Sequence, residues 1–299
     1  MSSAEAGLVE ETRAGTRDII EVCEPSSELV AEFFDLKDTQ LVIREGKFIA
    51  EGSEPLKLLL KNKWGIQPTK ILVKPSAYER LKEDISASAF EPAIFVMPGK
   101  KMAETVGYYG GARGVFCCGI VPKNRTFSWL LKNVLTAKKR KWRILAIDGS
   151  NNTANLGSMV RCASAFGIHA ILLSNDCCDP FYRQSVRVSM GHVFNVPIVR
   201  VENLSECLYF LSTEHDVKTF AAVIDKDSTF LKSIAAPLKD RWCVILGNED
   251  KGVSDAVRGI SGIVKLRIDI ASGVDSLSIT NATAVLLNGL REREAEDIW

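Results

Sequence analysis

The sequence predicts an α/β protein that consists of two successive α/β units. Short apolar runs rich in β-branched residues alternate with segments of helical spacing, which is typical of strands joined by crossover helices. A basic stretch at residues 138–143 lies between the two sets of elements. The 299 residues are 46% hydrophobic and 25% charged, so each unit has enough apolar side chains to bury a core of its own.

The first unit is expected to alternate between strands and helices from residue 41 onward. Its strands are predicted at residues 41–43, 47–50, 70–73, 93–96 and 115–118, where apolar and β-branched residues cluster. Its helices are predicted at residues 54–61, 76–83 and 102–109. Pro55 fits the first of these helices, because a first turn does not need the N–H that proline lacks.

The second unit shows the same alternation, and an amphipathic helix at residues 127–137 leads into it. Its strands are predicted at residues 144–147, 170–173, 196–201, 220–224, 242–246 and 263–266. Its helices are predicted at residues 155–166, 182–190 and 278–290. Asn155 is a favourable N-cap residue for the first of these helices, and Gly167 is a favourable residue just past its end.

These elements divide the chain into four parts. Residues 1–30 are polar and turn-rich and are expected to form a loosely ordered N-terminal arm, and residues 31–122 form the first domain. Residues 123–142 form a linker helix with a basic strip, and residues 143–299 form the second domain. The basic strip is either a solvated linker or a contact strip for RNA phosphates, with Trp142 available to stack or to pack.

Composition argues against several classes of protein. The net charge of +1 argues neither for nor against a nucleic-acid partner. None of the eight cysteines forms a CxxC pair and there are only three histidines, so we expect no metal site and reduced thiols in a cytoplasmic protein. The N-terminus resembles neither a signal peptide nor a transit peptide, and no run of about 18 apolar residues predicts a membrane-spanning helix.

Three polar loops of the second unit are the candidate site. They cover residues 151–157, which run into the helix that carries Arg161, and residues 246–254 and 268–278. Each follows or abuts a predicted strand, and ligands of parallel sheets bind beyond the carboxyl ends of strands. Neither a GxGxxG pattern nor a phosphate-binding GxxxxGK[ST] loop is present. Taken alone, Arg161 could equally form a surface salt bridge, and Ser254, Ser276 or Ser278 could serve only as a helix N-cap.

In this order, the three loops resemble the motifs of a known family. Residues 155–161 look like motif 1 of the SpoU (TrmH) branch of the SPOUT RNA methyltransferases, and residues 246–249, with Gly252 and Ser254, resemble motif 2. Residues 273–277, followed by an apolar helix, resemble motif 3. The resemblance covers about residues 143–291. More weakly, residues 48–52 and the leucine-rich helix after them are similar to a ribosomal-protein-like RNA-binding domain often fused to this family.

The resemblance implies a fold, an activity and a set of site residues. The implied fold is a C-terminal SPOUT α/β trefoil-knot domain in a homodimer, and the implied reaction transfers a methyl group from S-adenosyl-L-methionine (AdoMet) to a ribose 2′-hydroxyl of tRNA or rRNA. The implied catalytic residues are Asn155, Arg161, Glu249 and Ser278. The implied cofactor-binding residues are Leu246, Gly247, Asn248, Gly252, Ile268, Ile270, Ser276 and Leu277.

Two positions depart from the family pattern and leave alternatives open. Ser278 stands where the family usually has asparagine, and Asp269 replaces the common proline. A serine reaches less far than asparagine and offers no amide, so one alternative is a SPOUT-fold RNA-binding protein with impaired catalysis. A second alternative is a nucleotide-dependent enzyme acting on a small molecule, against which the missing phosphate-binding glycine loop argues. Arg161 is expected to orient and acidify the target hydroxyl rather than to accept its proton, because arginine stays charged.

Overall fold

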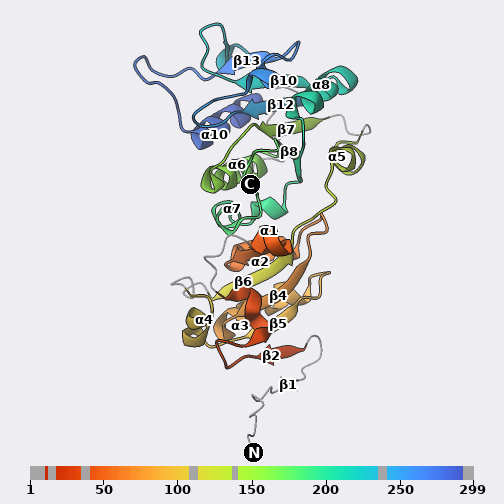
Figure 1. Cartoon of the computed structure of the whole chain (residues 1–299), viewed down its shortest axis with the longest axis vertical. Coiled ribbons are helices and arrows are strands. Elements are labelled where there is room, and N and C mark those ends of the chain that lie inside the picture. The colour runs from red at the N-terminus through yellow and green to blue at the C-terminus, as the bar shows by residue number, and fades with distance from the viewer. Residues whose placement is uncertain are drawn as a thin grey trace, which may run out of the picture. The chain divides into compact units, whose positions relative to one another are not determined.

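The computed structural model describes residues 11–12, 18–34, 41–107, 114–136, 141–234 and 241–291. The chain forms two compact units, and Figure 1 labels most of their helices and strands. Unit 1 comprises Met1–Pro122 together with Phe181–Phe194, and unit 2 comprises Lys123–Pro180 together with Asn195–Trp299. The division expected from the sequence differs here, because it assigned residues 181–194 to the second domain.

Unit 1 is built around a six-stranded mixed sheet in the order β1-β2-β5-β4-β6-β3. Its strands are β1 (Glu11–Thr12), β2 (Ile19–Glu21), β3 (Lys47–Glu51), β4 (Pro68–Val73), β5 (Ala93–Val96) and β6 (Val115–Ile120). Its helices are η1 (Glu28–Phe33), α1 (Leu41–Glu45), α2 (Ser53–Leu60), α3 (Pro75–Ser86), α4 (Gly99–Thr105), α7 (Arg183–Val188) and η3 (His192–Phe194). The expected α/β layer is therefore present in the described residues of this unit.

The N-terminal segment belongs to the core of unit 1. Strand β2 pairs with β5, and Val30 and Phe33 of η1 are fully buried against a cluster that includes Leu72 and Phe116. The loosely ordered arm expected over residues 1–30 therefore differs from the structure at residues 18–30. The strand predicted at residues 41–43 is wrong, since these residues begin helix α1. Three apolar residues in a row fit a strand or a buried helical turn equally well.

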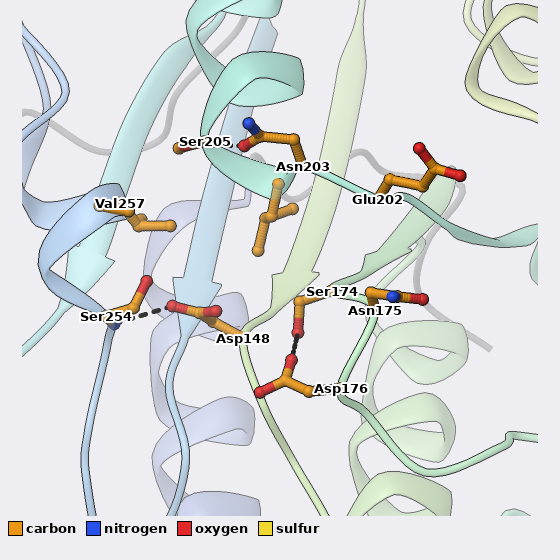
Figure 2. A pocket seen from close by; sticks show the side chains of 11 residues that line it. Asp148, Ser174, Asn175, Asp176, Glu202, Asn203, Ser205, Ser254 and Val257 are labelled. Atoms are coloured by element: carbon orange, nitrogen blue, oxygen red, sulfur yellow. Dashed lines mark hydrogen bonds between the residues drawn. The ribbon is translucent and has the colours of Figure 1, made fainter.

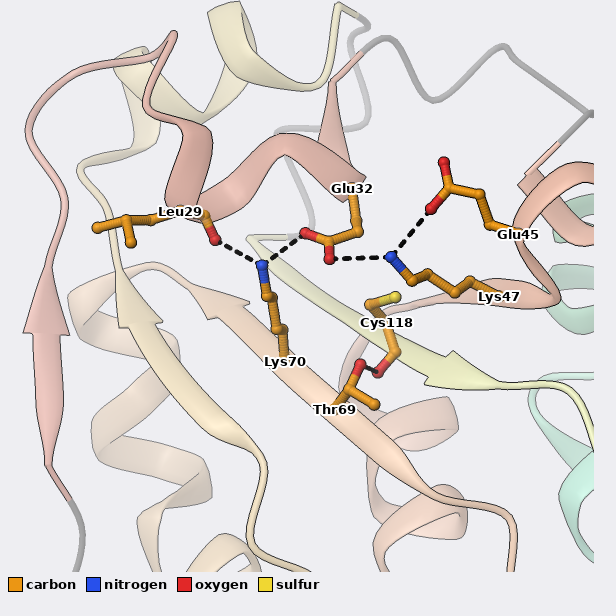
Figure 3. Close-up of polar contacts among 7 residues, drawn as sticks. All are labelled: Leu29, Glu32, Glu45, Lys47, Thr69, Lys70 and Cys118. Atoms are coloured by element: carbon orange, nitrogen blue, oxygen red, sulfur yellow. Dashed lines mark hydrogen bonds and ion pairs between the residues drawn. The ribbon is translucent and has the colours of Figure 1, made fainter.

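Ion pairs hold η1 against strands β3 and β4 of the sheet (Figure 3). Glu32 accepts hydrogen bonds from Lys70 at 2.8 Å and from Lys47 at 3.3 Å, and Lys47 also pairs with Glu45 at 2.9 Å. Burial of Glu32 raises its pKa, but the hydrogen bonds from the two lysines lower it by a larger amount. The pKa therefore lies below its usual value.

Residues 181–194 are anchored in unit 1 by aromatic and charged contacts. The Phe48 ring of β3 lies 5.4 Å from that of Phe181 and 5.1 Å from that of Phe194, and all three rings are buried. Arg183 pairs at 2.8 Å with Glu51, a carboxylate that is only 2% exposed. This segment interrupts unit 2 in sequence and completes the core of unit 1.

Unit 2 contains a seven-stranded parallel sheet in the order β11-β13-β10-β12-β7-β8-β9. Its strands are β7 (Trp142–Ile147), β8 (Ala170–Leu173), β9 (Ile198–Arg200), β10 (Lys218–Ala222), β11 (Thr229–Phe230), β12 (Arg241–Leu246) and β13 (Val264–Arg267). Its helices are α5 (Phe127–Asn133), α6 (Thr153–Ala165), α8 (Leu204–His215), η4 (Leu231–Ser233), α9 (Asp255–Arg258) and α10 (Ile279–Leu290). The central strands β7, β8 and β12 are almost entirely buried, which is why they are continuous apolar runs in the sequence.

Several details of unit 2 correct the sequence predictions. Helix α6 begins at Thr153, and its N-cap is Asn152 rather than Asn155. Trp142 is fully buried beneath the guanidinium of Arg241, 4.1 Å from its ring centre, so it packs and is not available to stack on a base. Residues 138–140 of the basic strip lie outside the described residues. Gly167 follows α6 with a φ of +67°, as its predicted position past a helix end requires.

The cysteines and helix lengths add two observations. All eight cysteines are free thiols, and Cys117, Cys118, Cys177 and Cys243 are buried. Burial raises the pKa of Cys118 to about 11, so this thiol stays protonated at neutral pH.

Among the described residues, no helix combines the length and apolar character needed to cross a membrane.

Candidate active site at the carboxyl edge of the sheet

Strand order places the three candidate loops next to one another. All strand pairs in the sheet of unit 2 are parallel, so the carboxyl ends of its strands lie along one edge. Strands β13, β10, β12 and β7 are consecutive neighbours in that sheet. The loop after β13 therefore lies near the loop after β10, and the loop after β12 lies beside the loop after β7.

Glu249 joins the first and second loops. Its Oε1 atom accepts hydrogen bonds from Asn155 Nδ2 at 2.8 Å and from Ser150 Oγ at 3.2 Å. Ser150 is fully buried and Glu249 is exposed, so the carboxylate holds the start of α6 from its solvent side. Asn155 lies in the first turns of α6 and is therefore a contact residue rather than the cap of that helix.

A tight turn places Glu249 in this position. Asn248 and Gly252 exchange two backbone hydrogen bonds of 2.9 Å, and Asn248 Oδ1 accepts from the amides of Asp250 and Lys251. A Cβ at Gly247 would lie only 2.0 Å from the carbonyl carbon of Gly252, so no other residue fits there.

The turn is also fastened to the loop after β7. Asn248 Nδ2 donates to the carbonyl of Gly149 at 2.6 Å, and Asp148 Oδ2 accepts from the amide of Ser254 at 2.8 Å. Loops that are about 100 residues apart in the sequence therefore form one hydrogen-bonded assembly.

A polar cavity of about 290 Å³ lies beyond β7, β8 and β9 (Figure 2). Its lining includes Asp148, Asp176 and Glu202, and Ser174 donates to Asp176 at 2.5 Å. Within the part of the chain that the structure describes, no group of three or more histidine, cysteine or acidic side chains is arranged to hold a metal ion. The carboxylates here serve to hold loops, as Asp148 does at Ser254 (Figure 2).

A second, largely apolar pocket of about 110 Å³ lies at the ends of β10 and β13. Residues 222–224 at the end of β10 form the first wall, and Ser276 and Leu277 with the first turns of α10 form the third. The second wall consists of Leu266, Arg267, Ile268 and Ile270. The backbone amides of Ser276 and Leu277 donate to no acceptor among the described residues. The pocket thus combines an apolar surface with free backbone donors.

The structure separates the expected site residues into groups. Four of the eight expected cofactor-binding residues line the apolar pocket, namely Ile268, Ile270, Ser276 and Leu277. Asn248 and Gly252 line a polar cavity beside Asp148, while Leu246 and Gly247 are buried under the turn. Sequence reasoning missed the wall at residues 222–224, although these residues end a predicted strand at the same edge.

Two expected catalytic residues lie apart from the Asn155–Glu249 contact. Arg161 is exposed on α6, lines none of the described pockets, and makes no hydrogen bond or ion pair with the described residues. Six residues of α-helix place it about 9 Å along the axis from Asn155. Ser278 is the N-cap of α10, and its Oγ accepts from the amide of Asn281 at 3.3 Å.

Comparison with known proteins identifies this arrangement. The chain is 27% identical over 273 residues to an uncharacterized tRNA/rRNA methyltransferase of Mycobacterium tuberculosis, with 90% of each chain covered. It is 29% identical over 160 residues to a 23S rRNA guanosine 2′-O-methyltransferase of Bacillus subtilis, covering 54% of this chain and 60% of that one.

Solved structures share the fold. An AdoMet-bound rRNA methyltransferase from Sinorhizobium meliloti matches with a TM-score of 0.72 at 21% identity, covering 91% of this chain and 97% of the other. The SpoU methyltransferase AviRb from Streptomyces viridochromogenes matches with a TM-score of 0.69 at 19% identity, covering 88% and 96%. The model of the SpoU rRNA Methylase family matches residues 143–288, which include all three loops. Residues 143–288 of this chain therefore belong to the SpoU rRNA methylase family.

Proposed function

We propose that this protein is an AdoMet-dependent RNA methyltransferase that acts on a ribose 2′-hydroxyl of tRNA or rRNA. The observation that carries the proposal is the Asn155–Glu249 hydrogen bond, which joins two family motifs at the sheet edge where the apolar pocket also opens. The relatives named as rRNA 2′-O-methyltransferases support the same reaction.

The apolar pocket fits the adenosine part of AdoMet. Ile268, Leu277 and Leu286 offer an apolar surface for a flat base, and the free amides of the third loop can bind its polar edge. AdoMet supplies an electrophilic methyl group on a sulfonium, so the chain's own residues need only position and polarise the acceptor. The turn at residues 246–252 would support the cofactor through its backbone.

Arg161 is the proposed catalytic residue. A guanidinium stays charged at any physiological pH, so it is suited to hold a phosphate or to favour ionisation of a hydroxyl. Arg161 is exposed, so its guanidinium is accessible to an RNA strand. Glu249 would act by holding Asn155 and the start of α6, and Ser278 can still donate its hydroxyl proton while it accepts from Asn281.

Other parts of the proposal concern the assembly. Arg161 lines none of the pockets described above, which favours a homodimer in which a second subunit completes the site. Helix α10 follows β13 and packs against α6, the helix that follows β7, and this contact between distant segments favours a C-terminal trefoil knot. Unit 1 would bind the RNA substrate. The cytoplasmic location stays a prediction from composition.

The two alternatives raised by the sequence are not retained. The comparisons give no support to loss of catalysis, and Asn155, Arg161 and Glu249 are all present. A nucleotide-dependent enzyme would need a phosphate-binding loop, but the loop after β7 is an asparagine-rich turn instead.

The test is to incubate the protein with labelled AdoMet and with tRNA or rRNA transcribed in vitro, which carries no modification. Wild-type protein should transfer label to one of these RNAs. Arg161→Ala should transfer none while it binds AdoMet with unchanged affinity in calorimetry. Wild-type turnover by Arg161→Ala would end the assignment of Arg161, and AdoMet binding without transfer to any RNA would contradict the reaction.

A further inference from the structure

Residues 225–233 connect the three walls of the apolar pocket, and we name this segment the brace. It begins directly after Ile224, which belongs to the first wall. Its middle part, strand β11, pairs in parallel with β13 by the registers Thr229–Leu266 and Phe230–Arg267, and Leu266 and Arg267 belong to the second wall. The brace thus extends the sheet by one edge strand beside the pocket.

The end of the brace contacts α10, the helix whose first turns belong to the third wall. A Cβ at Gly289 of α10 would lie 2.8 Å from Cδ2 of Leu231, so η4 packs closely against that helix. Leu286 and Ala282, about one and two turns earlier on α10, line the pocket. Movement of the brace would therefore be transmitted to α10.

Charged contacts tie the start of the brace to α9 and β13. Asp225 pairs with Arg258 at 2.5 Å and with Lys265 at 3.1 Å, and Asp227 pairs with Lys265 at 2.9 Å. Lys265 lies on β13, one residue before the second wall. This part of the brace is held at three points.

The other end of the brace contacts β13 and the loop that follows it, through cation–π contacts and an ion pair. The guanidinium of Arg267 lies 4.0 Å from the centre of the Phe230 ring, and the ammonium of Lys232 lies 5.1 Å from it. Lys232 also forms an ion pair with Asp269. Asp269 stands between Ile268 and Ile270, which both line the pocket, so the pair fixes the loop at the point where it borders the cavity.

We propose that the Lys232–Asp269 pair is a positioning device of this protein: it holds residues 268–270 in the conformation that binds the adenosine part of AdoMet. This rests on the proposed function, because it assigns AdoMet to the apolar pocket. The loop from residue 271 to 278 is exposed throughout, so restraint at Asp269 lowers the entropy lost when the cofactor binds.

The effect on cofactor binding is expected to be small and specific. The side chains of Lys232 and Asp269 are 64% and 48% exposed, and exposed pairs contribute about 1 kcal/mol or less. Lys232→Met should weaken AdoMet binding about two- to five-fold. It should raise the KM for AdoMet and leave kcat unchanged, because neither side chain lines the pocket or reaches the reacting atoms. Lys226→Met is the matched control, since Lys226 is an exposed lysine of the brace without a described ion pair.

Two rescue variants separate positioning from folding. The swap Lys232→Asp with Asp269→Lys restores an ion pair of opposite polarity and should return the affinity to near wild type. Asp269→Pro in the Lys232→Met background should also restore it, because proline restrains the backbone without any charge. The amide of Asp269 donates to no acceptor in the described part of the chain, so proline would break no such hydrogen bond there.

The experiment is calorimetric titration of the full chain with AdoMet at low and at high salt. Weaker binding by Lys232→Met, rescue by either double variant, and loss of the wild-type advantage at high salt support the proposal. Equal affinities of wild type, Lys232→Met and the control overturn it, as does an affinity loss that the charge swap fails to restore. Failure of the wild type to bind AdoMet would instead contradict the proposed function.

Discussion

Glu249 shows at the residue scale why the second motif needs a carboxylate. One oxygen accepts from both Asn155 and Ser150, and charge-assisted hydrogen bonds are stronger than neutral ones. The carboxylate thereby fixes the beginning of the helix that carries Arg161.

Glu249→Gln keeps the size of the side chain and removes its charge. We expect methyl transfer to fall about tenfold, because a hydrogen bond to a charged group is lost at the site. The affinity for AdoMet should stay within about twofold, because the apolar pocket does not include Glu249. Steady-state kinetics and calorimetry measure the two effects, with Glu214→Gln on α8 as control. A large loss of AdoMet affinity would show that Glu249 belongs to the cofactor site instead.

Glu32 gives a pH-dependent prediction. Its folded-state pKa lies below the usual value of 4.5, so its ion pairs stabilise the fold fully above that pH. The stabilisation is lost as the pH falls through the folded-state value. Glu32→Gln should therefore cost about 1 kcal/mol at pH 7 and progressively less in acid. Thermal unfolding of wild type, Glu32→Gln and the exposed control Glu28→Gln from pH 7 to acid measures this, and a constant difference would refute it.

Individual site residues were predictable only through motif resemblance. The sequence named Asn155 as both a cap and a site residue, and the structure gives the cap to Asn152. Polar residues at a loop–helix junction satisfy either role, and only the position of Glu249 decides between them. Ser150 carried no signal, because a single buried serine looks like any loop residue.

At the scale of elements, the turn after β12 is the most constrained part of the site. Gly247 has no room for a side chain, whereas Gly262 has open space but a φ of +82°. Gly247→Ala should destabilise the protein by about 3 kcal/mol through overpacking, and Gly262→Ala by about 1 kcal/mol through backbone strain. Denaturant unfolding measures both variants. Equal losses would mean that the turn can open to admit a side chain.

Buried parallel strands were the most predictable elements. Strands β7, β8 and β12 are apolar on both faces, so their sequences are continuous apolar runs. Helix α1 was mistaken for a strand, and helix α8 was not predicted. The elements β1, β2, η1, η3, β11, η4 and α9 were also not predicted. They are short and take their conformation from tertiary contacts such as those of Glu32 and Phe230, which no local pattern encodes.

At the scale of the whole molecule, the two units are not simply consecutive domains. Phe194 lies between strands of unit 2 in sequence but packs on Phe48 of unit 1. Phe194→Ala should destabilise unit 1 by about 3 to 5 kcal/mol, the usual cost of removing a buried aromatic ring. The half-exposed Phe210→Ala on α8 serves as control.

Hydrogen exchange can show which of the two units loses stability in Phe194→Ala. In Phe194→Ala, the amides of β3 should exchange faster while those of β7 keep their protection. Faster exchange confined to β7 and its neighbours would mean that residues 181–194 belong energetically to unit 2.

The central claim is that three loops of unit 2 build a site that methylates ribose oxygens of RNA. The most direct measurement is nucleoside analysis of RNA after incubation with the protein and labelled AdoMet. We expect label in a 2′-O-methyl nucleoside, recovered in a dinucleotide that resists alkali because cleavage requires a free 2′-hydroxyl, and no label with Arg161→Ala. Label on a base, or label that alkali releases in mononucleotides, would contradict the account.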